Sequence, residues 1–142
     1  MIKVKRKVHI VHLAHGRKAV TDKPPPSANV PAGRIPRISR LMALAILFDR
    51  LIREGKVSDQ SELARLAHVT QPRMTQIMNL NHLAPDIQEE LLFLPLVTNG
   101  RERIHERMLR PIAAQADWVE QRRTWHEVRA ATDRQSQPPA AF

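Results

Sequence analysis

Apolar residues recur every three or four positions through most of the chain after residue 36, a spacing typical of amphipathic helices. The first such stretch has Ser39 as a candidate N-cap and Gly55 as a C-terminal stop. Its apolar stripe consists of Leu41, Leu44, Ala45, Phe48, Leu51 and Ile52. Residues 41–48 are more apolar than a surface helix requires, so we expect them at the centre of the core or in a dimer interface.

Two short helices should follow. Asp59 and Glu62 resemble a capping box and predict a helix to about Ala67. Thr70 can cap the next helix, expected to run to about residue 82, with Pro72 tolerated in its first turn.

Three more helices complete the predicted body. One should begin at Pro85 and end near residue 94, and another should span about residues 101–110 and stop at Pro111. Asp117 can cap the last, which carries Trp118 and Trp125 seven residues apart on one face. We expect the two indoles to pack rather than to stack on bases.

The segment before this body has a different pattern. Residues 2–13 alternate between apolar and basic side chains, which predicts a strand, and we expect no second strand in the chain to pair with it. It would then pair with another copy, lie on the helical body, or order only on binding. Residues 1–21 are thus a basic strand-like arm, 22–36 (five prolines) a linker, 37–132 the helical domain and 133–142 a disordered tail. The predicted fold is all-α, a small helical bundle preceded by this arm.

The second and third helices fit the spacing of a helix-turn-helix. Counting from Gln60, the places usually buried in this unit are all apolar, namely Leu63, Ala64, Ala67, Val69, Met74 and Ile77. Ala64 is small, as a close helix crossing needs. His68 stands at the turn position usually taken by Gly, and His enters the left-handed region more readily than most residues.

The complementary positions would face outward, and they carry one positive charge and no acid. They are Thr70, Gln71, Pro72, Arg73, Thr75, Gln76 and Asn79. Arg can form two hydrogen bonds with guanine, and Gln or Asn can form two with adenine. Thr70 and the N-terminus of the helix can hold a phosphate. A short helical hairpin with its polar side in water would show similar spacing, but the acid-free face favours DNA.

Composition strengthens this interpretation. The 142 residues carry a formal charge of +9, and residues 1–40 hold ten basic residues and one acid, whereas the rest is neutral. Such asymmetry indicates a polyanionic partner, with a solubilising tail as the alternative. The basic residues expected on DNA are Lys3, Lys5, Arg6, Lys7, Arg17, Lys18, Arg34 and Arg37.

Residues 58–110 resemble the helix-turn-helix segment of the ParB and KorB plasmid-partition proteins. The shared features are Glu-Leu-Ala at 62–64, Val-Thr at 69–70, and the stretch Leu-Ala-Pro-Asp-Ile-Gln-Glu-Glu-Leu at 83–91. The resemblance implies an all-α domain that binds a palindromic DNA site as a dimer, with Thr70, Gln71, Arg73 and Gln76 in the groove. It does not extend to the nucleotide-binding motif of ParB, so CTP-driven clamping is not implied. The layout is also similar to that of short bacterial proteins found with mobile elements.

Other chemistries find little support. The chain has no Cys, no stretch of membrane-spanning length and no apolar signal segment, so we expect a cytoplasmic, nucleoid-associated protein without a membrane partner. His9, His12 and His15 cannot converge on a metal in a strand, because spacing of three alternates the faces. His105 and Glu106 are adjacent, and a solvated charged helix face explains them better than an acid–base pair. We therefore expect no enzyme activity, metal or cofactor.

The sequence thus predicts a homodimeric, sequence-specific binder of double-stranded DNA, such as a transcriptional regulator of a mobile or plasmid-like element. An accessory factor in recombination or partition is one alternative. An RNA- or protein-interaction module with a polyanion-binding arm is another.

Overall fold

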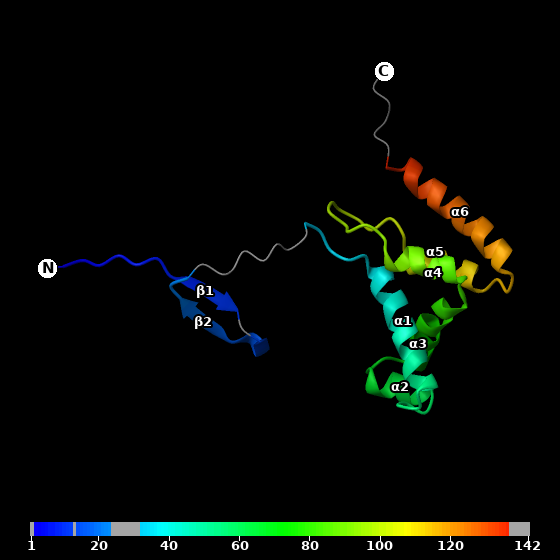
Figure 1. The fold of residues 1–142 in the computed structure, drawn as a ribbon, viewed down its shortest axis with the longest axis horizontal. Helices are drawn as coiled ribbons and strands as arrows, with labels where there is room; N and C mark the ends of the chain where they lie inside the picture. The colour runs from blue at the N-terminus through cyan, green and yellow to red at the C-terminus, as the bar shows by residue number, and fades with distance from the viewer. Residues whose placement is uncertain (1, 13, 24–31, 137–142) are drawn as a thin grey trace, which may run out of the picture. The chain divides into compact units, whose positions relative to one another are not determined.

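The chain divides into two compact units, residues 1–32 and 33–142, which are described separately (Figure 1). The structure is a computed structural model that describes residues 2–12, 14–23 and 32–136. In this described part, no helix has the length and apolar character needed to cross a membrane.

The first unit is a β-hairpin. Strand β1 (His9–His12) pairs antiparallel with β2 (Lys18–Thr21), and His9 lies opposite Thr21. The expectation that the chain holds no second strand was therefore wrong. The chain reverses in a turn of 3-10 helix (Ala14–Gly16), where His15 has φ of 63° and Gly16 of 74°. The signal was present, because a residue tolerant of positive φ followed by glycine precedes the alternating Lys-Ala-Val-Thr.

The hairpin has no apolar interior. Ile10 and Val20 are cross-strand partners, and both side chains are largely exposed. Residues 2–8 continue the chain before β1 without regular secondary structure, and the apolar Ile2 and Val4 are exposed as well. One ion pair, between Arg6 and Asp22 at 2.8 Å, links the two sides of the hairpin. A two-stranded hairpin without a core is marginally stable in water.

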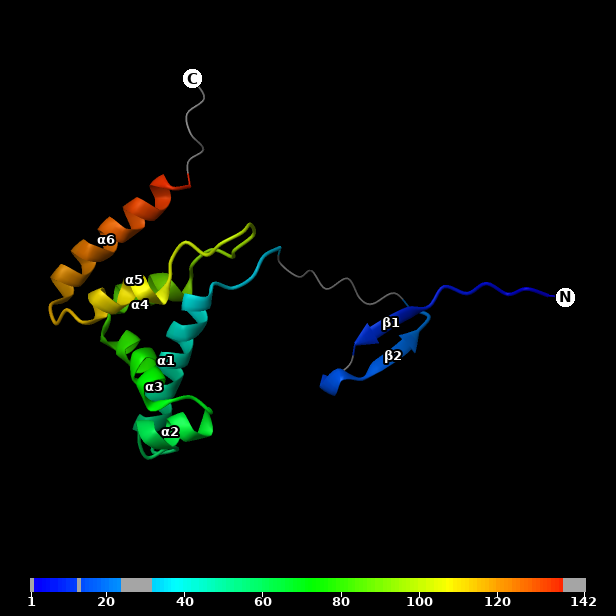
Figure 2. The same ribbon diagram turned by 180° about the vertical axis from the view of Figure 1, so that it is seen from behind.

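The second unit is helical, so the protein is mostly helical with one small antiparallel sheet (Figures 1 and 2). Its helices are α1 (Arg37–Arg53), α2 (Gln60–Leu66), α3 (Gln71–Met78), α4 (Pro85–Leu92), α5 (Glu106–Ala113) and α6 (Trp118–Arg134), with a 3-10 turn (Asn79–His82) after α3. Within this unit α2 lies at one end and α6 at the other, with α1 and α3 side by side between them (Figures 1 and 2).

Two apolar clusters hold the helices together, and α1 contributes to both. The main core joins the N-terminal half of α1 to α4, α5 and α6, with Met42, Ile87 and Trp125 at most 1% exposed. A smaller cluster consists of Val57, Leu63, Ala64, Met74 and Met78, packed by the C-terminal half of α1. Within residues 41–48, Leu41, Met42 and Ala45 are buried in the core and Phe48 packs against both clusters. The other four, Ala43, Leu44, Ile46 and Leu47, are exposed, so only part of this stretch belongs to the core.

Several helix boundaries differ from those predicted, and α3 ends at Met78 rather than near residue 82, because a 3-10 turn follows it. Helix α1 begins at Arg37 after Pro36, and Ser39 is no cap: it is buried and its hydroxyl donates to the Leu91 carbonyl at 2.6 Å. Helix α5 starts only at Glu106, and Pro111 lies inside it rather than ending it. Pro111 has no amide N–H, so α5 lacks one helical hydrogen bond there. Burial of Ile112 in the core offsets this loss and stabilises the last turn of the helix.

The predicted linker and tail are only partly described. Residues 24–31 and 137–142 lie outside the described residues, but α6 reaches Arg134, inside the predicted tail. Arg34 pairs with Val97 through two backbone hydrogen bonds of 3.0 and 2.8 Å, so the end of the predicted linker belongs to the helical unit. A side chain at Gly33 would meet Leu96 and the Val97 carbonyl at 3.0 Å, and the φ of 122° also requires glycine there.

One buried amide joins α6 to the start of α4. Gln121 is fully buried; its Oε1 accepts from the Ala84 amide, and its Nε2 donates to the carbonyls of His82 and Gln115. Nearby, the Arg122 guanidinium donates to Asp86 and lowers the pKa of that carboxyl below its usual value. These contacts hold the segment after α3 against the rest of the unit.

The two tryptophans have different environments. Trp125 is 1% exposed, and its indole N–H donates to Glu90 at 2.9 Å. Trp118 is 47% exposed, with the Arg122 guanidinium 6.0 Å from its ring centroid. The expected packing role therefore holds for Trp125 but not for Trp118.

Candidate nucleic-acid interface

Helices α2 and α3 are joined by a tight turn centred on His68. His68 has φ of 55°, the left-handed conformation predicted for it, and the Val69 amide donates to the Ala64 carbonyl at 3.0 Å. Ala64 is buried where the helices pack. The small side chain permits this close approach, and the left-handed turn directs the chain into α3.

Each helix begins with a side-chain cap. Asp59 accepts from the Glu62 amide at 2.8 Å, and Thr70 accepts from the Arg73 amide at 3.4 Å. The Glu62 carboxylate in turn accepts from the hydroxyl and amide of Ser58, which lowers the pKa of Glu62 below its usual value. Both predicted helix starts are thus confirmed.

Five of the six side chains predicted to face inward are buried or half-buried. Leu63, Ala64, Met74 and Ile77 are buried and Val69 is half-buried. Ala67 is exposed, contrary to the prediction, because α2 ends at Leu66 and Ala67 already belongs to the turn.

The seven predicted outward positions fall into two groups. An exposed group consists of Thr70, Gln71, Pro72, Thr75 and Asn79. Arg73 and Gln76 are half-buried instead, because they face α5. The exposed edge of α3 is therefore polar and uncharged.

The one charge on this helix is engaged in an ion pair. Arg73 Nη1 lies 2.8 Å from both carboxylate oxygens of Glu106 and 3.2 Å from Gln76 Oε1. Arg110 Nη2 approaches the same Gln76 oxygen at 3.3 Å and Glu106 at 3.6 Å. The Glu106 side chain is only 13% exposed, so the prediction that it belongs to a solvated helix face was wrong.

Sequence reasoning missed this acid because Glu106 lies 33 residues beyond Arg73. Nothing in the local spacing of α3 signals a carboxylate supplied by α5. The outward positions of α3 carry no acid themselves, but α5 brings one beside them.

Beside this network lies a basic pocket of about 330 Å³, lined by α1, α3 and α5 together with the segment before α5. Four arginines and two glutamates line it, namely Arg37, Arg73, Arg107, Arg110, Glu102 and Glu106. Glu102 accepts from the Arg34 guanidinium and from the Arg37 amide, each at 3.0 Å. Arg34, predicted in the linker, and Arg37, predicted at the start of the helical domain, are thus both held in the helical unit.

The six arm residues predicted to bind DNA lie in the hairpin unit and are exposed: Lys3, Lys5, Arg6, Lys7, Arg17 and Lys18. Arg6 has the Asp22 carboxylate as its partner. His9 is half-buried and His12 exposed, as alternation along β1 requires. Among the described residues, no group of three or more His, Asp or Glu side chains is placed to hold a metal.

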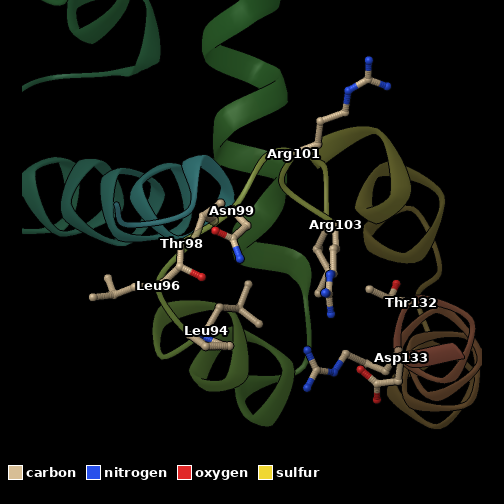
Figure 3. Close-up of a pocket in the computed structure, with 12 residues that line it drawn as sticks. Leu94, Leu96, Thr98, Asn99, Arg101, Arg103, Thr132 and Asp133 are labelled. Carbon is tan, nitrogen blue, oxygen red and sulfur yellow. The ribbon is translucent and has the colours of Figure 1, made fainter. Parts of the chain in front are cut away.

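A separate pocket of about 300 Å³ lies between residues 94–104 and α6 (Figure 3). Arg103 donates to the hydroxyl of Ser136, which follows the C-terminal end of α6, whereas Arg101 points away from the pocket (Figure 3). None of the residues predicted to bind DNA lines it.

Comparison of the chain with protein-family models, with curated proteins and with solved structures finds no match. Function must therefore be argued from the residues themselves.

Proposed function

We propose that this protein binds double-stranded DNA sequence-specifically, with α2–α3 acting as a helix-turn-helix and α3 entering the major groove. The observation that carries the proposal is the exposed, uncharged polar edge of α3, positioned by the left-handed turn at His68. A helix whose outer edge served only solubility would more often carry Lys or Glu.

The chemistry of this edge suits base recognition. Gln71 and Asn79 offer both a donor and an acceptor, which together match the N6 and N7 edge of adenine. Thr75 can contact a thymine methyl group. The Thr70 hydroxyl and the Gln71 amide at the start of α3 can donate to a phosphate, which fixes the register of the helix on the duplex.

The hairpin unit would supply sequence-independent affinity. Its exposed Lys and Arg side chains have few acids near them, so they are available for phosphates. Arg37 lines the pocket beside Arg73 in the helical unit, where it can contact the DNA backbone close to the α3 footprint, whereas Arg34 is paired with Glu102. Non-specific affinity would then depend mainly on the six hairpin residues.

The protein would act as a homodimer in regulating a mobile or plasmid-like element, as the likeness to ParB and KorB suggests. One helix-turn-helix reads half a site, so two copies would read half-sites about 34 Å apart or a multiple of that. The partly exposed Leu44, Ile46 and Leu47 on α1 support an apolar contact between copies.

Selection from a random duplex library, followed by sequencing, tests the proposal. We expect an enriched palindrome with the full chain and loss of enrichment with Gln71→Ala/Asn79→Ala. Gln135→Ala, at the exposed end of α6, is the matched control that should keep the motif. If the full chain binds but enriches no motif, an RNA- or protein-interaction module becomes the better account.

A further inference from the structure

The side chain of Gln76 is oriented by two arginines from different helices. Its Oε1 accepts from Arg73 Nη1 at 3.2 Å and from Arg110 Nη2 at 3.3 Å. A guanidinium can only donate hydrogen bonds, so the amide oxygen, not the amide nitrogen, must face both arginines. A carbonyl oxygen has two lone pairs, and both are therefore used within the protein.

Glu106 holds this arrangement in place. Its carboxylate lies between the two arginines, at 2.8 Å from Arg73 and 3.6 Å from Arg110, and is mostly shielded from solvent. Charge-assisted hydrogen bonds to a shielded carboxylate are stronger than neutral ones. Arg73 is thus retained by α5, although it belongs to the helix proposed to read DNA.

We propose that Glu106 is a specificity-determining residue. It keeps Arg73 off the DNA, and by holding the two arginines on Gln76 Oε1 it leaves only the amide N–H groups of Gln76 free to contact bases. This inference rests on the proposed function. The two-point contact of Gln with adenine needs the amide to donate to N7 and to accept from N6. With Oε1 occupied, Gln76 can only donate, so it selects base edges that present acceptors, such as guanine or thymine, and disfavours the N4 donor of cytosine.

Four full-length proteins test the inference: the wild type, Glu106→Gln, Arg73→Ala and the control Glu120→Gln. Glu120 is paired with Arg123 on the surface of α6, so its substitution removes the same charge from an arginine partner elsewhere. Each protein is assayed by selection from a random duplex library and by salt titration on one random duplex. Thermal unfolding verifies that each is folded.

Glu106→Gln should release Arg73 toward the DNA. We expect the log K against log [salt] slope to steepen by about 0.9, the value for one added phosphate contact, and the selected motif to change at the Gln76 position. Glu120→Gln should change neither quantity. If Glu106→Gln keeps the wild-type motif and slope, the inference is overturned while the proposed function stands.

Arg73→Ala gives a second test that does not depend on the fold of the Glu106 variant. If Glu106 retains Arg73 in the wild type, Arg73→Ala leaves the salt slope on random DNA unchanged and alters only the base preference at the Gln76 position. A slope flatter by about 0.9 would show that Arg73 already contacts phosphate and would overturn the inference. A wild type that binds no DNA overturns the proposed function and the inference together.

Discussion

The hairpin unit and the helical unit use their charges in different ways. Residues 1–32 hold seven basic residues and one acid, whereas residues 33–142 hold sixteen basic residues and thirteen acids. In the helical unit many arginines are paired, among them Arg34, Arg73 and Arg122. The number of arginines near α3 therefore overstates the positive charge that the helical unit could offer to the proposed DNA ligand, and the hairpin unit offers more.

The two units also differ in what holds them together. The helical unit has two apolar clusters joined by α1, whereas none of the hairpin residues whose exposure is described is buried. Backbone pairing of four residues a side does not by itself stabilise a hairpin in water. The hairpin would thus gain order from a partner, and the helical unit from its own packing.

Removal of residues 1–32 should have the largest effect. Each lost phosphate contact flattens the log K against log [salt] slope by about 0.9, so loss of the six contacts proposed for Lys3, Lys5, Arg6, Lys7, Arg17 and Lys18 would flatten it by about 5. The helical unit should stay folded and retain a preference for the selected site. Binding measured across a salt series checks this.

Full-length protein with those six residues changed to Gln is the matched control, because it keeps the hairpin and removes only the six proposed phosphate contacts. A truncated protein that keeps the full slope would show that the hairpin is not the electrostatic anchor. Pairing between two chains would then be the better role for its alternating pattern.

Truncation of Trp125 tests the difference in packing. Trp125→Ala should lower the free energy of unfolding by about 3–5 kcal/mol, because it leaves a cavity in the core and removes the indole N–H that donates to Glu90. Phe93→Ala, at a side chain that is 77% exposed, should change it by less than about 0.5 kcal/mol. Val20→Ala in the hairpin should leave the main denaturation transition unchanged, and a shift there would mean that the units unfold together.

Gln71→Ala should separate specific from non-specific binding. We expect a loss of about 1–3 kcal/mol on the selected site and little loss on random duplex, because a base-edge contact forms only in register. Competition binding with the two DNAs measures both. Equal losses would assign Gln71 to the phosphate backbone.

The smallest effect concerns two histidines with positive φ, one in each unit: His15 at 63° and His68 at 55°. His68→Gly should raise the free energy of unfolding of the helical unit by about 0.5–1 kcal/mol, since glycine relieves the left-handed strain but loses more chain entropy. His15→Gly should leave that transition unchanged. A thermal melt in which both variants behave alike would contradict the independence of the two units.

Local signals predicted much of the helical unit. Caps at Asp59, Thr70 and Asp117 and the stop at Gly55 act within a turn of the helix, so they can be read from neighbouring residues. The left-handed turn at His68 followed from the same logic. The hairpin was also within reach, but β2 is short and its turn contains His-Gly rather than a common two-residue turn.

The sequence by itself determined the positions of the main helices, the exposed polar edge of α3 and the concentration of charge before residue 41, because each depends on residues close together in the chain. Only the tertiary structure decided which charges remain free. Glu106 reaches Arg73 and Glu102 reaches Arg34 across 33 and 68 residues. Such pairs depend on how distant segments pack against each other. The sequence pattern within one helix therefore does not predict which charged side chains its neighbours place beside it.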